Sequence, residues 1–265
     1  MAAVYEILTD AAYESTERAE AVNECLKWLN RLGFNDWLPP ALAFAVRRRN
    51  QPQLMERFFS NLERLAYFML VTKSGINERI ERFSRLTKSI ETNEDLWLAD
   101  SPLQLSAWEQ QSMYSVLAGP IYENLAARAR SAVLLRLDAL VSAGGATYDY
   151  ATITVEHVLP QTPAADSKWL AWFPDPAKRL EWVHKLGNLA LLTRKKNSAA
   201  QNYEFDRKKA AYFSQEGGSP FVITTQVLQH EEWTQAVVEA RQNELLRKLE
   251  QHWRLEGRED ILNAL

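Results

Sequence analysis

Two short apolar segments constrain the fold of this 265-residue chain more than any other feature. The first, residues 153–155, consists of β-branched residues and leads into Glu156 and His157 before Pro160 ends it. The second, residues 189–193, is an apolar run that ends on a threonine. Short apolar runs bounded by turn residues predict strands. A long connection separates the two segments, so we expect a strand, a long loop and a second strand.

A pair of asparagines flanks the second segment. Asn188 precedes it, Asn197 follows it, and the intervening Arg194, Lys195 and Lys196 lead into a helix-like stretch. The order along the chain is therefore strand, loop, strand and helix, with a Glu-His pair at the end of the first strand. This order is typical of a ββα-metal nuclease unit.

The remainder of the chain is predicted to be helical. Apolar residues recur at intervals of three and four with charges between them, which is the period of an amphipathic helix. Residues 142–145 break this pattern and mark a domain boundary. The predicted fold is therefore mainly α, with an N-terminal helical bundle in residues 1–145 and, in residues 146–265, the ββα-metal unit followed by C-terminal helices.

Composition and charge narrow the class of protein. Hydrophobic residues make up 46% and charged residues 25% of the chain, as in ordinary globular proteins. The sequence has no apolar run of membrane-spanning length and no signal pattern, and its single cysteine, Cys25, excludes an intrachain disulfide and a multi-cysteine zinc site. We therefore expect a cytoplasmic protein without membrane association. Because the net charge is −3, binding to nucleic acid would need a local basic patch.

Glu156, His157 and the two asparagines are the candidates for a site that hydrolyses a phosphodiester. An imidazole titrates near neutral pH, so His157 is the natural general base. The Glu156 carboxylate and the Asn197 amide oxygen are ligands of the kind that Mg²⁺ or Mn²⁺ prefers. Side chains alternate along a strand, so Glu156 is expected to point away from His157 unless the strand end is twisted. Asn188 would hold the loop or orient His157.

Each of these residues also has a purely structural explanation. A Glu-His pair at a strand end is usually a surface pair, Asn188 follows a glycine as turn residues do, and Asn197 occupies a common helix-cap position. The remaining histidines, His184, His230 and His252, lie in helix-like stretches and are expected to be packing or surface residues. A role near the phosphate is the alternative for His184.

The order of these segments carries a family resemblance. It resembles the C-terminal domain of GmrSD-type restriction endonucleases, which is an HNH (His-Me finger) nuclease domain. Residues 57–64 are similar to the helical region that precedes the nuclease in single-chain members, and the final helix is similar to the closing segment of the family. The residues of the motif are Glu-His-Val-Leu-Pro-Gln at 156–161, Leu-Gly-Asn-Leu-Ala-Leu-Leu at 186–192, Asn197, Phe205 and Lys208.

The resemblance implies roles for individual residues. His157 is the base and Asn188 the central asparagine of the motif. Asn197 takes the third position, where many relatives carry histidine, and this leaves the identity of the metal open. Glu156 stands where other HNH proteins often place an aspartate as metal ligand, and its longer side chain puts that role in question.

Family members usually carry an N-terminal half that senses modified DNA, uses nucleotide and has a signature like Pro-Phe-Gln-Arg. The present sequence contains neither that signature nor a phosphate-binding glycine loop. The expectation is that this chain is the effector part. Its partner would be a sensor domain or subunit of the same system that uses nucleotide.

Positive charge gathers around the second strand. Residues 178–209 contain nine basic and three acidic residues, in a chain that is negative overall. A basic face of this kind suits contact with the DNA backbone without reading of bases. The predicted DNA-binding residues are Arg194, Lys195, Lys196, Arg207, Lys208 and Lys209.

Three functions follow from these patterns. The leading one is a metal-dependent DNA endonuclease that nicks or cuts foreign DNA in bacterial anti-phage restriction. The second is a catalytically inactive helical module that docks DNA or a partner in a defence complex. The third is a nuclease directed at RNA.

Overall fold

The computed structural model describes residues 2–142, 153–193, 202–213 and 219–258. In this part of the chain the fold is mainly helical, with a small two-stranded sheet, which confirms the predicted class. The chain divides into two compact units. The first comprises Met1–Met113 with Leu255–Leu265, and the second comprises Tyr114–Arg254.

The first unit is built around its longest helix. Twelve of the twenty residues of α4 are buried, and α4 packs against α2 and α3. Phe44 of α3 stacks on Phe58 of α4 with ring centroids 3.9 Å apart. The helices of this unit are α1 (Ala2–Thr9), α2 (Ala19–Asn30), α3 (Leu38–Arg48), α4 (Pro52–Val71), α5 (Ile76–Glu91) and η3 (Glu256–Arg258), and α6 (Ala107–Ala118) crosses the division between the units.

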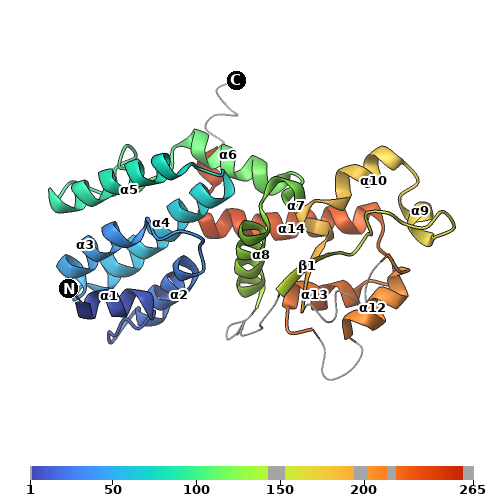
Figure 1. Ribbon diagram of the computed structural model, residues 1–265, viewed down its shortest axis with the longest axis horizontal. Coiled ribbons are helices and arrows are strands. Elements are labelled where there is room, and N and C mark those ends of the chain that lie inside the picture. Colours follow the sequence, from blue (N-terminus) through green and yellow to red (C-terminus); the bar gives the residue numbers. More distant parts are fainter. Residues whose placement is uncertain (1, 143–152, 194–201, 214–218, 259–265) are drawn as a thin grey trace. The chain divides into compact units, whose positions relative to one another are not determined.

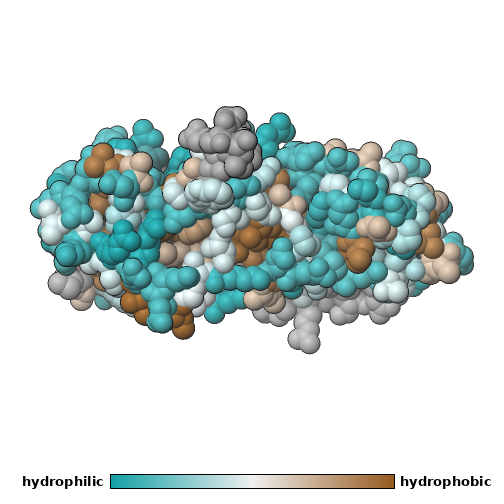
Figure 2. All heavy atoms as spheres, turned by 90° about the horizontal axis from the view of Figure 1, so that it is seen from above, coloured by the Kyte–Doolittle hydropathy of each residue, from teal (hydrophilic) through white to brown (hydrophobic). Residues whose placement is uncertain are grey.

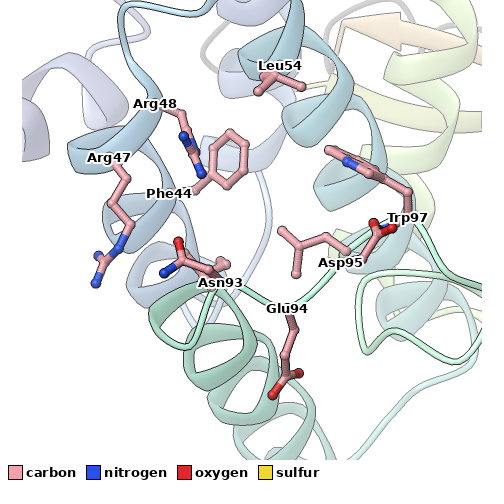
Figure 3. A pocket seen from close by; sticks show the side chains of 10 residues that line it. Phe44, Arg47, Arg48, Leu54, Asn93, Glu94, Asp95 and Trp97 are labelled. Carbon is pink, nitrogen blue, oxygen red and sulfur yellow. Dashed lines mark hydrogen bonds between the residues drawn. The ribbon is translucent and has the colours of Figure 1, made fainter.

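A pocket in the first unit lies between α3 and the segment that follows α5 (Figure 3). Arg47 and Arg48 line one side of it, and Asn93, Glu94 and Asp95 line the other. Its volume of about 120 Å³ is well below that of pockets that enclose small-molecule ligands. This pocket is therefore too small to enclose a ligand of that size.

The second unit contains both strands and the remaining helices (Figure 1). Its strands are β1 (Ile153–His157) and β2 (Leu189–Thr193), and β2 has the bounds that the sequence predicts. Its helices are α7 (Ile121–Asn124), α8 (Ala127–Val141), α9 (Lys168–Trp172), α10 (Pro176–Val183), η1 (Leu186–Asn188), α12 (Phe205–Phe213), α13 (Val222–Thr225), η2 (Gln226–Gln229) and α14 (Gln235–Trp253).

The two strands pair antiparallel. Glu156 lies opposite Ala190 and His157 lies opposite Leu189. Residues 189–192 of β2 are buried, which explains the uninterrupted apolar run in its sequence. The pairing brings the Glu-His end of β1 next to η1, the turn that precedes β2.

The division between the units falls earlier than the boundary predicted near residue 145. Helix α8, which was assigned to the N-terminal bundle, packs against β1, α13 and α14 in the second unit. The fully buried carboxylate of Asp138 on α8 accepts a hydrogen bond of 2.8 Å from the backbone nitrogen of Ile223. The helical period of α8 could not show which apolar surface it covers, and this contact ties it to the strand-containing unit.

Helix α14 packs directly against the turn that precedes β2. A Cβ atom added at Gly187 would lie 2.4 Å from the carbonyl oxygen of Val238, so only glycine allows α14 to approach this closely. Gln242 accepts a hydrogen bond of 2.6 Å from the Gly187 nitrogen, and Arg241 donates to the carbonyl oxygens of Gly187 and Leu189 at 2.7 and 3.0 Å. Helix α14 therefore sets the position of β2.

Hydrophilic residues dominate the face of the molecule drawn in Figure 2, and hydrophobic residues form small, separate patches on it. Among the described residues, no helix has the length and apolar character needed to cross a membrane.

Candidate active site

Strand β1 ends on Glu156 and His157, the Glu-His pair of the predicted site. Successive side chains of a strand point to opposite faces. The Glu156 carboxylate accordingly meets Lys208 of α12, whereas the His157 ring meets Tyr122 and His184. Both Glu156 and His157 are buried, so this Glu-His pair is not the ordinary surface pair considered as an alternative.

His157 lies in a cluster of polar and aromatic side chains. Its Nε2 atom is 3.1 Å from Nδ1 of His184, and its Nδ1 atom is 3.3 Å from the amide nitrogen of Gln161. The ring of Tyr122 packs against it with centroids 4.1 Å apart. Nε2 of His184 is in turn 3.3 Å from Oε1 of Glu123. The imidazole of His157 is therefore held at both of its nitrogen atoms.

The environment keeps His157 uncharged. Burial, and after it the charges of His184, Lys208 and Arg130, lower the pKa of His157 from 6.5 to about 3. The guanidinium of Arg130 stays near because it stacks on the ring of Tyr122 at 3.7 Å and donates to the Tyr122 carbonyl oxygen. At neutral pH the imidazole has a lone pair with which it can take a proton.

Helix α12 is anchored to the second unit by its first residue. The ring of Phe205 packs against the rings of Trp169, Trp172 and Trp233, with centroid distances between 5.6 and 5.9 Å. Residues three apart lie on the same side of a helix. Lys208 therefore points inward beside Phe205, and its side chain is only 1% exposed.

The buried ammonium of Lys208 joins α12 to the end of β1. Its Nζ atom donates to Oε1 of Glu156 and to the carbonyl oxygen of His157, both at 2.6 Å. Burial lowers the pKa of Lys208, and the neighbouring Glu156 carboxylate raises it. This position differs from the predicted phosphate contact, because the Lys208 ammonium faces the interior and not the solvent.

Asn188 is fully buried and forms hydrogen bonds with three segments. Its Oδ1 accepts from the backbone nitrogen of Leu159 at 2.7 Å and from Nε1 of Trp233 at 3.0 Å. Its Nδ2 donates to the carbonyl oxygens of Leu159 at 3.0 Å and Val183 at 2.8 Å. This geometry matches the loop-holding alternative for Asn188, since the side chain fixes the residues that follow β1.

We expect Asn188→Ala to lower the free energy of unfolding by about 3–4 kcal/mol, because it leaves several buried polar groups unpaired. Urea denaturation followed by tryptophan fluorescence measures the change. Asn202→Ala, at an exposed position of the same unit, serves as the control and should change stability by less than about 0.5 kcal/mol. Equal stability of the two variants would show that Asn188 does not hold the loop.

The described residues do not assemble a cation site by themselves. No group of three or more His, Cys, Asp or Glu side chains among them is placed to hold a metal ion. The Glu156 carboxylate is already neutralised by an ammonium at 2.6 Å, and a divalent cation beside that ammonium would be repelled. Asn197, the other predicted ligand, lies outside the described residues, as do Arg194, Lys195 and Lys196.

The other two predicted DNA contacts are placed on α12. Arg207 is exposed, and its guanidinium stacks over the ring of Tyr203 at 3.5 Å. Lys209 is partly buried and donates to the carbonyl oxygen of His230 at 3.1 Å. Of the three basic residues at 207–209, Arg207 is the one whose side chain faces the solvent.

Comparison with known families covers this same part of the chain. The model for GmrSD restriction endonucleases, C-terminal domain, matches residues 115–248, which nearly coincide with the second unit. The chain belongs to this family. No curated protein matches the chain. Membership in the GmrSD family implies a nuclease of a restriction system with DNA as its substrate, and nucleases of this kind typically use divalent cations.

Several residues around the GmrSD motif histidine were not singled out by sequence reasoning. Tyr122, Glu123 and Arg130 come from α7 and α8, ahead of the predicted domain boundary. His184, for which the sequence predicts a packing or surface role with a place near the phosphate as the alternative, is the hydrogen-bond partner of His157. Its proximity to Gly187-Asn188 in the sequence is the one signal that could have drawn attention to it.

Proposed function

We propose that this chain is an HNH-type DNA endonuclease in which His157 is the general base. The observation that carries the proposal is the position of the imidazole. It lies at the end of β1, antiparallel to β2, with its Nδ1 atom toward Gln161 and its Nε2 atom on a neighbouring histidine. The lowered pKa leaves the imidazole unprotonated at neutral pH, which a base must be before it can accept a proton.

In this proposal the reaction is hydrolysis of one phosphodiester bond. His157 takes a proton from a water molecule as the water oxygen attacks phosphorus. The bond between phosphorus and the departing 3′ oxygen breaks, and that oxygen takes a proton from solvent water. Asn188 and Lys208 contribute by fixing the two ends of the segment that carries His157, since they bind Leu159 and the His157 carbonyl oxygen.

The proposal includes a divalent cation, Mg²⁺ or Mn²⁺, because nucleases of this kind typically use one. When bound, it would offset charge on the phosphate. The predicted ligand Asn197 remains the proposed contact to this ion. Glu156 is better explained as the partner of Lys208 than as a metal ligand.

Arg207, and the basic residues of segment 194–201, are the proposed contacts to the DNA backbone. Arg207 is exposed on α12, one residue before the buried Lys208. Arg130 is a further candidate, because its guanidinium stacks on the Tyr122 ring beside His157. Contacts of this kind predict binding that weakens with salt and has little preference for sequence.

One observation favours the second candidate function, an inactive docking module. His157, Glu156 and Lys208 are all buried, and both His157 nitrogens already have partners within the chain. A module of this kind would bind DNA or a partner subunit without cleaving it.

Relaxation of supercoiled plasmid by the full chain separates these functions. The nuclease proposal expects nicked or linear DNA with Mg²⁺ or Mn²⁺ and none with EDTA. A docking module would retain DNA in the presence of EDTA and leave the plasmid supercoiled at every metal concentration. Offering RNA in parallel identifies an RNA-directed enzyme, which would cleave RNA in preference to DNA.

The neutral His157 also predicts how stability depends on pH. In the unfolded chain its pKa is near 6.5, whereas in the folded chain it is about 3, so below pH 6.5 the unfolded state binds the extra proton. Stability should therefore fall by about 1.4 kcal/mol for each pH unit below 6.5 and be fully present above that pH. Unfolding measured between pH 7.5 and 5 tests this. His157→Gln should lack this component of the slope, and equal slopes would contradict the prediction.

A further inference from the structure

Two contacts fix which nitrogen of His157 carries the hydrogen. The amide nitrogen of Gln161 can only donate, so the Nδ1 atom of His157, 3.3 Å away, must accept. Nε2 of His157 then carries the hydrogen and donates it to Nδ1 of His184 at 3.1 Å. The lone pair of His157 is therefore on Nδ1, and it can take a proton from water once the Gln161 amide has moved off it.

The contact of His184 with Glu123 leads to the same assignment of hydrogens. Its Nε2 atom is 3.3 Å from the Glu123 carboxylate, which accepts hydrogen bonds and donates none when it is ionised. Nε2 of His184 therefore carries a hydrogen, and in the neutral form of this ring Nδ1 is left as the acceptor for His157. Donation runs in one direction, from His157 to His184 to Glu123.

Contacts of the backbone and of the Tyr122 ring hold these side chains at fixed positions relative to one another. The Tyr122 nitrogen donates to the carbonyl oxygen of His184 at 3.1 Å, which ties α7 to the residue after α10. The Tyr122 ring lies against both imidazoles, 4.1 Å from His157 and 5.5 Å from His184. Lys208 holds the His157 carbonyl oxygen at 2.6 Å. Rotation of the His157 ring would break its contacts on both sides.

We propose that His184, supported by Glu123, is the positioning residue that holds His157 in the Nε2-protonated tautomer. This inference rests on the proposed role of His157 as general base. His184 contacts neither DNA nor the attacking water, which would approach Nδ1 from the Gln161 side. When Nδ1 takes the proton, Nε2 still donates to His184, and the Glu123 carboxylate offsets the new positive charge.

Four variants of the full chain test this role. His184→Leu keeps the bulk of the side chain and removes the acceptor, whereas His184→Asn restores an acceptor near the position of Nδ1. Glu123→Ala removes the carboxylate at an exposed position, so it tests the same contact if His184→Leu does not fold. Glu181→Ala removes a carboxylate of α10 that pairs with lysines and is the matched control.

The first readout is the tautomer of His157, obtained from long-range ¹⁵N–¹H correlation spectra of histidine-labelled protein. The second is the rate of plasmid nicking. We expect a single Nε2-protonated tautomer in the wild type and a mixture in His184→Leu. In that variant kcat should fall about 10- to 100-fold with KM unchanged. His184→Asn should recover most of the loss, Glu123→Ala should show a smaller loss, and Glu181→Ala should match the wild type.

An unchanged tautomer together with an unchanged kcat in His184→Leu would overturn the inference. A fall in activity that His184→Asn does not recover, with the tautomer unchanged, would also overturn it by showing a merely structural role. If the wild type does not cleave DNA, the proposed function fails. The tautomer spectra then still decide whether His184 and Glu123 control the protonation of His157.

Discussion

His157→Ala is expected to lower the rate of DNA cleavage by about 10³-fold, within the range that a general base contributes. The substitution removes the Nδ1 atom that is proposed to take the proton from water. This atom lies on the Gln161 side of the ring, away from His184. Retention of DNA should be nearly unchanged, since His157 is buried and uncharged at neutral pH. The measurement is the initial rate of plasmid nicking at saturating metal, with DNA retention followed by gel shift in EDTA.

The control for this experiment is His252→Ala on α14. His252 contacts the ring of Trp253 and lies outside the histidine pair, so its loss should leave the nicking rate close to that of the wild type. His157→Gln provides a second variant of similar volume in case the alanine leaves a cavity. Metal-dependent nicking at the wild-type rate in both His157 variants would exclude His157 as the base.

Lys208→Met is expected to lower the free energy of unfolding by about 3–5 kcal/mol, which is typical when one member of a buried ion pair is removed. The substitution leaves the Glu156 carboxylate buried without its cation and removes the donor to the His157 carbonyl oxygen. Denaturant unfolding measures the loss. Lys209→Met, at the next and partly exposed position, should change stability by less than about 1 kcal/mol.

Glu156→Gln combined with Lys208→Met tests whether the two residues act as a pair. The double variant should be more stable than the sum of the single variants predicts, by about 2–3 kcal/mol, because neither charge is then left alone. A cation ligand would behave differently. If Glu156 held a metal, Glu156→Gln would remove stabilisation by added Mg²⁺ or Mn²⁺ while Lys208→Met would not, and the two substitutions would show no coupling in the absence of metal.

The strands of the candidate site could be predicted because their signals are local. Residues 189–193 form a buried strand, and an apolar run of this length between turn residues is typical of a strand and short for a helix. The opposite orientation of Glu156 and His157 follows from the period of a strand. These features depend on neighbouring residues, so the sequence is sufficient to predict them.

The partners of these residues depend on contacts between distant segments. Lys208 stands in a run of basic residues, which usually marks a solvated face, and only the docking of Phe205 among tryptophans turns it inward. Glu123 lies far from His157 in the sequence, and the backbone bond from Tyr122 to His184 brings it close. No periodicity encodes such pairings, and the helical period of α8 likewise does not encode its packing against β1, α13 and α14.

The closure of the Gly187 turn by α14 bears on how the chain is synthesised. The hydrogen bond from Gly187 to Gln242 joins residues 55 positions apart in the sequence. The turn before β2 therefore lacks its contacts with α14 until that helix has left the ribosome. A nascent chain that stops short of residue 241 cannot form the clamp of Arg241 on the carbonyl oxygens around this turn. In the proposed nuclease, the cleaving centre would thus mature only after α14 has been synthesised, and chains that lack this helix would not cleave DNA.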